Sequence, residues 1–383
     1  MFNVVKIQKL FISKSYYEIP ADQQKAYLEK LGDASDDIER SYKQYKCQRC
    51  VSTWYVRSLC DGILFFVIPF LVLVLFIKSL FVRKQQEIKC LGDFVGMEEI
   101  LPDELHRQYN VNNEHWNEGA ILKFSDIRYV LKFIIRYPLS PMFSLKCLIK
   151  LARYSYLYHV YSAQVIIVHN EYSYTSSLLT DYCHFRGIKH INVMHGEKLA
   201  IIRDSYFHYD KCYVWDDYYI KLFISLKAEP TQFIISLPKS MRIDRGKYTN
   251  ENDFADYKYY LNSSDENKLV AIKKSLAFVA KEGKTVKYRP HPRYSNISVV
   301  ERILGKENIE YPNRTSILSS IANCGCVISS YSTVLNQAYH SGIDVLIDDV
   351  AEKEMYDKLK MFRYILISNN IPCLSQKQVE MIE

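Results

Sequence analysis

The chain has 383 residues, of which 48% are hydrophobic and 24% charged, so its composition is that of a globular protein and excludes a disordered one. This length exceeds one ordinary hydrophobic core and predicts at least two domains. The 50 basic and 43 acidic residues leave a net charge of +7, which favours anionic partners only weakly. No basic cluster is interleaved with aromatic residues, so we expect no nucleic-acid partner.

The first 84 residues predict a helical N-terminal extension, with a charged helix over residues 21–46. A hydrophobic segment follows at 63–82, interrupted by Lys78 and containing Pro69. A bilayer span needs about 20 apolar residues, which this segment reaches if Lys78 extends to the surface and the proline is tolerated as a kink. It is either a membrane-associating segment, spanning or re-entrant, or a buried core helix.

Residues 85–225 predict a first α/β domain. Apolar periodicity and short apolar runs alternate in this region. Helices are expected over 126–136, 143–158 and 175–185, and strands over 164–168, 189–194 and 212–215. Strand, helix and strand at this spacing are typical of βαβ units in a parallel, Rossmann-like sheet.

Residues 226–383 predict a second domain of the same kind. It begins with a strand at 233–236, continues through a polar, asparagine-rich stretch to Asn267 and then repeats the helix-and-strand alternation. Further strands are expected near 285–288, 325–328 and 345–347, and helices over 266–281 and 316–322. We therefore expect two Rossmann-like domains after the N-terminal extension, with ligands bound at the cleft between them.

A cationic loop follows the strand near residue 288. It contains Arg289, His291, Pro292 and Arg293, and a proline stands on each side of the histidine. Prolines restrict the backbone, so the loop presents its side chains in defined directions. A histidine between two arginines can bind a diphosphate or a phosphodiester and stabilise the negative charge on the leaving group. The alternative is a proline-rich surface turn with solvated charges.

Four hydroxyl residues follow the strand near residue 328, namely Ser329, Ser330, Ser332 and Thr333, and a helix is predicted directly after them. Hydroxyls and free backbone N–H groups at a strand-to-helix junction suit a phosphate. A helix N-cap alone would use only one or two of the four. Both loops lie at carboxyl ends of strands, where α/β proteins bind their ligands.

Three residues of the first domain are candidates for a general base that deprotonates an acceptor hydroxyl. His195 and Glu197 surround Gly196 after the strand at 189–194, and Glu171 follows the preceding strand. Solvated loop carboxylates are the common alternative. Asp216 and Asp217 are interpreted as a helix N-cap pair, because no Asp-x-Asp occurs in the chain to hold a divalent metal.

Metal binding through cysteine is also not expected. The ten cysteines are scattered, and only Cys47 and Cys50 form a Cys-x-x-Cys pair. A structural zinc site needs a second pair at suitable spacing, which does not follow. We therefore expect no metal and no cofactor, and scattered thiols are typical of a reducing compartment.

These motifs together resemble GT-B glycosyltransferases with cytidine-nucleotide donors, the bacterial sialyltransferases and polysialyltransferases of capsule and lipooligosaccharide synthesis. Those enzymes carry a His-Pro motif and a Ser-Ser/Thr motif that contact cytidine monophosphate. The matching positions here are His291-Pro292, Ser329-Ser330 and Ser332-Thr333. The family's acidic pair before glycine is not reproduced, since residues 194–197 read Met-His-Gly-Glu with the acid after the glycine.

The chain is also similar to the teichoic-acid polymerases, which transfer glycerol phosphate from CDP-glycerol. Those enzymes carry a His-Gly motif with a histidine base, which His195-Gly196 matches, together with a His-Pro motif and a late serine-rich loop. The similarity extends from about Val165 to Ile347. It implies an α/β GT-B fold of two facing Rossmann-like domains, with the acceptor bound by residues 85–225 and the donor by residues 226–383.

The resemblance implies an inverting, metal-independent glycosyltransferase at the cytoplasmic face of the bacterial inner membrane. His195 or Glu197 would deprotonate an acceptor on a glycan or lipid-linked saccharide, and His291 with the hydroxyl loop would stabilise the departing nucleotide. The donor would be CMP-sialic acid or a similar sugar, and the product a capsule or O-antigen polysaccharide. The alternatives are a CDP-glycerol-type polyol-phosphate transferase and a non-catalytic membrane-associated nucleotide-binding protein.

Overall fold

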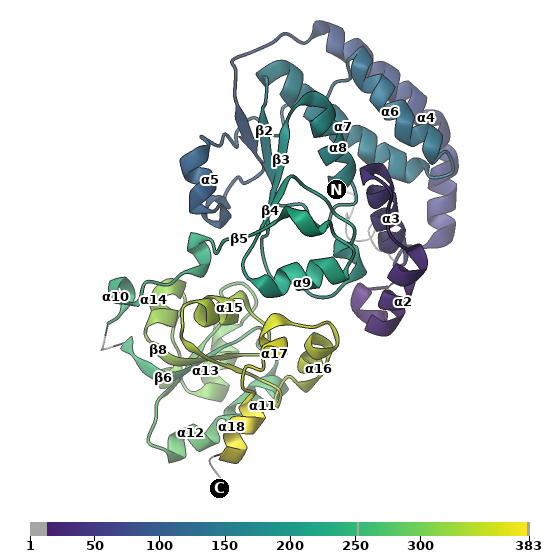
Figure 1. Cartoon of the computed structure of the whole chain (residues 1–383). Coiled ribbons are helices and arrows are strands. Elements are labelled where there is room, and N and C mark those ends of the chain that lie inside the picture. Colours follow the sequence, from purple (N-terminus) through teal and green to yellow (C-terminus); the bar gives the residue numbers. More distant parts are fainter. Residues whose placement is uncertain (1–13, 251–252, 381–383) are drawn as a thin grey trace. The chain divides into compact units, whose positions relative to one another are not determined.

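The computed structural model describes residues 14–250 and 253–380, and the chain divides into two compact units (Figure 1). The first unit comprises the residues up to His195 together with Ala200–Ser236. The second comprises Gly196–Leu199 and the residues from Leu237 onward. The chain therefore passes between the units after His195, after Leu199 and after Ser236. Residues 1–13 of the predicted N-terminal extension lie outside the described residues.

The first unit is built on a five-stranded parallel sheet with the order β1-β2-β3-β4-β5. The strands are β1 (Cys90–Gly92), β2 (Val165–Val168), β3 (Lys189–Val193), β4 (Lys211–Val214) and β5 (Phe233–Ile235). All four residues of β2 are buried, which explains its continuous apolar sequence, because both faces of a parallel sheet are covered. Since the strands are parallel, their carboxyl ends share one edge of the sheet.

Helices cover both faces of this sheet (Figure 1). They are α2 (Ala21–Leu31), α3 (Asp37–Arg49), α4 (Trp54–Phe81), α5 (Asp103–Gln108), α6 (Phe124–Arg136), α7 (Pro141–Tyr161), α8 (Ser176–Arg186) and α9 (Asp217–Ser225). On one face of the sheet, Val165, Ile167 and Ile191 form an apolar cluster. Leu105 of α5 and Leu101, which precedes this helix, pack against them. Asp216 caps α9 by accepting from the N–H of Tyr218 at 2.8 Å, which confirms its predicted N-cap role.

Helix α4 contains residues 63–81 of the hydrophobic segment 63–82 and is 28 residues long, sufficient to cross a membrane by length and composition. Its buried residues, Ile68, Leu75 and Ser79, lie along one side. In its most apolar stretch of 18 residues, only 17% of the residues are buried. Phe66 is 78% exposed. This exposure excludes the interpretation of α4 as a core helix of the unit, and its association with a membrane stays a prediction.

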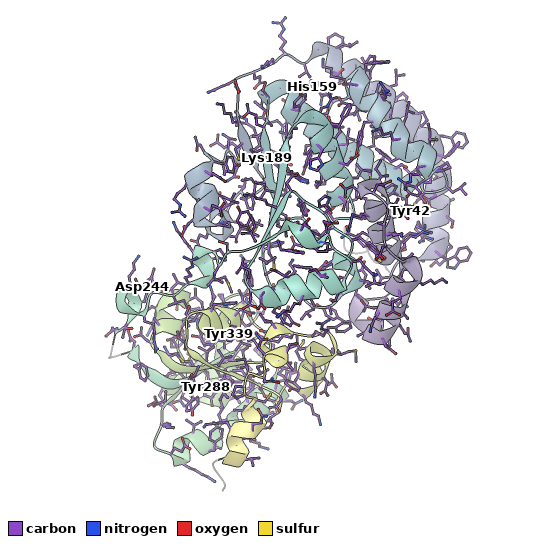
Figure 2. All side chains as sticks on the ribbon, in the orientation of Figure 1. Tyr42, His159, Lys189, Asp244, Tyr288 and Tyr339 are labelled. Carbon is purple, nitrogen blue, oxygen red and sulfur yellow. The ribbon has the colours of Figure 1, made fainter. Side chains whose placement is uncertain are left out.

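The second unit contains a four-stranded parallel sheet with the order β7-β6-β8-β9. Its strands are β6 (Ala255–Tyr260), β7 (Val286–Arg289), β8 (Cys324–Ser329) and β9 (Asp344–Ile347). Its helices are α10 (Arg245–Tyr248), α11 (Glu266–Ser275), α12 (Ala277–Lys281), α13 (Ile297–Leu304), α14 (Ile317–Ala322), α15 (Thr333–His340), α16 (Lys353–Met361), α17 (Ile365–Ser368) and α18 (Leu374–Glu380). Tyr259, Tyr288 and Ile328 form an apolar core with residues of α11 and α13; Tyr288 is labelled in Figure 2.

The predicted α/β fold with two Rossmann-like sheets is confirmed, and three elements differ from expectation. The helix expected over 21–46 is two helices, because Gly32 adopts a φ of 63° between them. The strand β5 pairs with β4 in the first sheet rather than opening the second domain, so the units divide after residue 236 instead of residue 225. Strand β6 lies in the polar, asparagine-rich stretch that ends at Asn267, where no strand was predicted.

Candidate functional site

His195 lies directly beyond the carboxyl end of β3 in the first unit, at the edge opposite to Lys189, which begins the strand (Figure 2). Its Nδ1 is 3.9 Å from Oε1 of Glu171, which follows β2. The His195 side chain is 31% exposed, whereas the Glu171 side chain is fully buried. The structure thus brings together two of the three residues predicted as a general base, because β2 and β3 are neighbours in the sheet.

A hydrogen-bond network holds Glu171 in place. Asn192, a buried residue within β3, donates from Nδ2 to Oε2 of Glu171 at 3.2 Å. The Oδ1 of Asn192 accepts from the N–H of Asn170 at 2.8 Å, which fixes the amide. Gln44 of α3 donates to the Glu171 carbonyl at 3.0 Å. A buried carboxylate requires such partners, and here they leave its Oε1 close to an imidazole.

A second histidine completes this edge of the first unit. The ring of His169, which directly follows β2, lies 4.4 Å from that of His195 at 74°, and Phe94 contacts its other side at 5.7 Å. Neither His169 nor Asn192 is among the site residues predicted from the sequence. An available signal was the polar Asn192 inside an otherwise apolar strand, since a buried amide needs a polar partner.

This arrangement suits proton transfer. An imidazole can accept a proton near neutral pH, and a buried carboxylate beside it orients the ring and stabilises the imidazolium that forms. Partial exposure of His195 leaves its ring accessible to an acceptor hydroxyl. The group we call the histidine edge consists of His169, Glu171, Asn192 and His195.

Glu197, the remaining candidate base, has a different environment. Gly196 precedes it with a φ of 65°, a conformation that disfavours residues with a Cβ. Glu197 belongs to the second unit. There its Oε2 accepts a hydrogen bond from Nδ2 of Asn336 in α15 at 2.8 Å. Burial, with a contribution from the Glu197 charge, raises the pKa of Tyr364 well above its usual range. These contacts favour His195 over Glu197 as the base.

In the second unit, His291 follows β7 and is held by its own loop. Its Nδ1 accepts from the N–H of Arg293 at 3.1 Å, its N–H donates to Ser295 Oγ at 3.0 Å, and its ring stacks on Tyr294 at 4.4 Å. Because Nδ1 accepts, the neutral imidazole carries its proton on Nε2, where it can donate to a phosphate oxygen. Pro292 and Arg293 are exposed.

The four predicted hydroxyls after β8 divide into two kinds. Ser329 is fully buried and donates to the Tyr260 carbonyl at 2.9 Å, and Ser332 caps α15 by accepting from the N–H of Val334 at 3.3 Å. These two hydroxyls stabilise the unit itself. Of the other two, Thr333 is exposed, whereas Ser330 is 2% exposed and its Oγ accepts from Asn262 at 3.0 Å. A hydroxyl that accepts in this way can still donate its own proton to a ligand.

Residues after β6 connect the two predicted motifs. Asn262 donates from Nδ2 to Ser330 Oγ at 3.0 Å and to the Tyr331 carbonyl at 3.1 Å. Ser263 accepts at its carbonyl from Ser295 Oγ at 3.4 Å, within the His291 loop. Since β6 lies between β7 and β8, these contacts unite the His291 loop and the Ser330 loop at one edge, which we call the hydroxyl edge. Asn262 and Ser263 were missed because β6 was not predicted.

Arg289 does not belong to the hydroxyl edge, and its predicted donor-binding role is corrected. It is 6% exposed; its Nη1 donates to Glu310 Oε2 at 2.9 Å and its Nη2 donates to the Thr315 carbonyl at 2.8 Å. Lys258, fully buried in β6, donates to Glu310 Oε1 at 2.7 Å. Burial alone would raise the pKa of Glu310, but Lys258, Ser320 and Arg289 outweigh it and lower that pKa. The guanidinium therefore neutralises a buried carboxylate.

Among residues 14–250 and 253–380, no cluster of three or more His, Cys, Asp or Glu side chains is arranged to hold a metal ion. At the hydroxyl edge, the exposed Arg293 and the N–H groups that begin α15 offer positive charge and partial positive charge to a phosphate.

No protein-family model matches the sequence, and no curated protein matches it. Among solved structures, the chain is similar to a UDP-GlcNAc 2-epimerase from Neisseria meningitidis bound to UDP-GlcNAc, with TM-score 0.40 and 11% identity over 71% of this chain and 85% of that one. A putative UDP-N-acetylglucosamine 2-epimerase from Listeria monocytogenes has TM-score 0.41, 10% identity and coverages of 72% and 86%. The glycotransferase of kitacinnamycin has TM-score 0.40, 10% identity and coverages of 73% and 86%. Similarity at this level carries no argument about substrate or reaction.

Proposed function

We propose that this chain is an inverting glycosyltransferase that uses a nucleotide-linked sugar, with His195 as general base and the hydroxyl edge as the nucleotide-phosphate site. The observation that carries the proposal is the buried Glu171 carboxylate 3.9 Å from the imidazole of His195, at the carboxyl ends of β2 and β3. A fully buried carboxylate beside a partly exposed histidine is typical of an activated base.

The reaction balances as one displacement. His195 takes the proton of the acceptor hydroxyl, and the acceptor oxygen forms a bond to the anomeric carbon of the donor sugar. The bond from that carbon to the donor's phosphate oxygen breaks with inversion, and its electron pair leaves with the nucleotide. Glu171 stabilises the imidazolium until the proton passes to solvent.

The second unit would stabilise the nucleotide that leaves. The Nε2–H of His291, the hydroxyls of Ser330 and Thr333, and the N–H groups that begin α15 are donors suited to phosphate oxygens. Arg293 supplies an exposed positive charge in the same loop. This binding mode requires no metal ion.

The finer identity of the donor is also a proposal. The resemblance to sialyltransferases favours a cytidine-linked sugar such as CMP-sialic acid and a cell-surface polysaccharide as product. The histidine next to Gly196 favours the second candidate, a polyol-phosphate transferase that uses CDP-glycerol. Uridine nucleotides are tested beside the cytidine nucleotides as a further nucleotide class.

We also propose that the enzyme works at the cytoplasmic face of a bacterial inner membrane, on a lipid-linked saccharide or glycan. The support is α4, because only 17% of the residues in its most apolar stretch are buried in the unit.

Nucleotide binding followed by transfer tests the proposal. Thermal unfolding of the full-length protein is measured with CMP, CDP, UDP and GDP, and then transfer is assayed with CMP-sialic acid, CDP-glycerol and UDP-sugars. We expect one nucleotide class to raise the unfolding temperature, and His291→Ala to weaken that binding. His195→Ala should keep nucleotide binding and lower transfer by about 10²–10⁴-fold, the usual contribution of a general base.

Three results would contradict the proposal. Nucleotide binding without any transfer would favour a non-catalytic protein. Full transfer by His195→Ala would remove the assigned base, and unchanged nucleotide affinity in His291→Ala would remove the assigned phosphate site. Turnover of CDP-glycerol alone would select the polyol-phosphate transferase.

A further inference from the structure

A cavity of about 520 Å³ lies in the first unit where α3 ends and α4 begins. Its lining includes Lys14, Tyr45, Arg49, Arg57, Met142 and Tyr174, and we call it the cationic pocket. Ligand pockets commonly measure roughly 300–1,000 Å³ and combine an apolar wall with a few polar groups. The cationic pocket has this size and mixture, and nothing in the proposed transfer reaction uses it.

The charges around the cationic pocket are predominantly positive. Lys14, Arg49 and Arg57 line it, and of its described lining residues none is Asp or Glu. Asp61 lies outside the lining, with its Oδ2 4.0 Å from Nε of Arg57, and its Oδ1 accepts from the N–H of Met142 at 2.8 Å. Among the described residues that line the pocket, three are cationic and none is acidic, an imbalance that an anion would correct.

Two polar atoms of the pocket have no hydrogen-bond partner among the residues that the structure describes. They are the hydroxyl of Tyr45, a residue only 5% exposed, and Nε of Arg57. Burial raises the pKa of Tyr45 to about 12, so its hydroxyl is a neutral donor at physiological pH. Buried polar groups are almost always satisfied in folded proteins, and both of these atoms are donors. They call for an acceptor such as a phosphate oxygen.

The start of α4 adds to this preference. Thr53, the N-cap residue, makes no side-chain capping hydrogen bond, and the N-terminus of a helix favours negative charge. Trp54 and Tyr55 in the first turn of α4 are 70% and 62% exposed. Tryptophan and tyrosine concentrate at the headgroup level of a bilayer, which places the pocket at that level when α4 meets a membrane.

Beyond this turn, α4 presents apolar side chains to its surroundings. Phe66, Phe70 and Phe81 are 78%, 68% and 79% exposed. Figure 1 shows α4 and α6 at the outer edge of the first unit, and Phe124 and Ile135 of α6 are 79% and 71% exposed. An apolar surface of this extent marks a membrane or partner contact.

We propose that the cationic pocket binds the phosphate group of an anionic lipid whose acyl or prenyl chain lies along α4. A phosphate would accept from Tyr45 and from the guanidinium groups of Arg49 and Arg57, and charge-assisted bonds of this kind are strong. A lipid is favoured over a soluble phosphate, because the pocket lies at the beginning of α4, whose first turn exposes Trp54 and Tyr55. The inference rests on the membrane association proposed for α4, and it holds whichever nucleotide the second unit binds.

The test measures lipid binding by the full-length protein in a neutral detergent. Dissociation constants are compared for dioctanoyl phosphatidic acid, dioctanoylglycerol, which lacks the phosphate, and inorganic phosphate. We expect phosphatidic acid to bind at least about 10-fold more tightly than either, the effect of one or more charge-assisted hydrogen bonds.

Two variants and a control locate the site. Arg49→Gln with Arg57→Gln should weaken phosphatidic acid binding by about 10-fold or more, and Tyr45→Phe by about 2- to 10-fold. The control, Arg107→Gln with Lys189→Gln, removes the same charge from exposed positions of the same unit that do not line the pocket, and it should bind as the wild type does. Tyr45→Phe removes only a hydroxyl, so it decides the matter if the double variant does not fold.

Equal affinity for phosphatidic acid and dioctanoylglycerol would overturn the proposal, and so would wild-type affinity in Tyr45→Phe and the double arginine variant. Inorganic phosphate binding as tightly as phosphatidic acid would overturn the lipid assignment in favour of a soluble anion. The measurement needs neither nucleotide nor turnover. Nucleotide binding without lipid preference would therefore refute the pocket alone, and lipid preference without nucleotide binding would refute the transferase alone.

Discussion

The two units place buried charge differently around similar parallel sheets. In the first unit, the buried Glu171 carboxylate lies at the edge of the sheet, where it accepts from Asn192 and lies beside a partly exposed imidazole. In the second unit, the buried Glu310 carboxylate contacts both Lys258 and Arg289 and is fully compensated. The first arrangement is suited to move a proton, and the second to stabilise the fold. Charge type alone does not distinguish them; the partners do.

Glu310→Gln should produce the largest change, because it leaves Lys258 and Arg289 buried without their carboxylate. Breaking a buried ion pair in this way costs about 3–5 kcal/mol of folding free energy. Hydrogen exchange of peptides from β6 and β8 reports on the second unit separately. Glu307→Gln, an exposed carboxylate in the same unit, is the control and should leave exchange unchanged. Wild-type protection in Glu310→Gln would contradict the assigned structural role.

The same carboxylate predicts a pH dependence. The folded-state pKa of Glu310 is below its ordinary value of 4.5, so its contribution to stability is complete above about pH 4.5 and is lost as the pH falls through the lowered pKa. We expect protection of β6 and β8 to decline in acid more steeply in the wild type than in Glu310→Gln. Parallel acid profiles for the two proteins would argue against this linkage.

Glu171→Gln makes the matched change in the first unit, with the opposite balance of effects. The glutamine keeps the shape of the side chain but cannot stabilise an imidazolium, so transfer should fall by about 10²-fold, within the range for general base catalysis. Stability should change by about 1 kcal/mol, since the amide oxygen of glutamine can still accept the hydrogen bond from Asn192. Hydrogen exchange of β2 and β3 and a pH–rate profile check both expectations. A large loss of exchange protection together with normal turnover would mean that Glu171, like Glu310, mainly stabilises the fold.

Asn262→Ala tests whether the hydroxyl edge is one site. The substitution removes both hydrogen bonds to the Ser330 loop, which should lower stability by about 1 kcal/mol and nucleotide affinity by up to about 10-fold. Calorimetric titration with the best nucleotide measures the affinity. Unchanged affinity would mean that the His291 and Ser330 loops act independently.

Ser332→Ala should have the smallest effect, about 1 kcal/mol of stability from loss of the α15 N-cap. Ser316→Ala is matched to it, because Ser316 caps α14 in the same unit by accepting from the N–H of Ser319 at 3.1 Å. Because Ser332 is occupied as a cap, both variants should bind nucleotide as the wild type does. Weaker binding in Ser332→Ala alone would restore its predicted ligand role.

Much of the chain's organisation was accessible from local sequence. The strands β2, β3, β7 and β8 are short apolar or β-favourable runs bounded by polar residues or proline, and the exposed helix α4 is an apolar run of bilayer length. His195, His291 and Ser330 were assigned to strand ends because the hydrophobic pattern stops there. These features depend on neighbours a few residues away, which the sequence displays directly.

Only the tertiary structure decided what the polar residues do. Strand β6 was not predicted because it contains a lysine, Lys258, which is unusual in a buried strand. Lys258 can be buried because Glu310, which is distant in sequence, neutralises its charge. Arg289 pairs with the same carboxylate and therefore does not belong to the predicted donor site. Because β2 and β3 are neighbours in the sheet, Glu171 lies beside His195. The burial of a charge depends on a counter-charge or hydrogen bond supplied by another segment, so its role follows from strand order and packing.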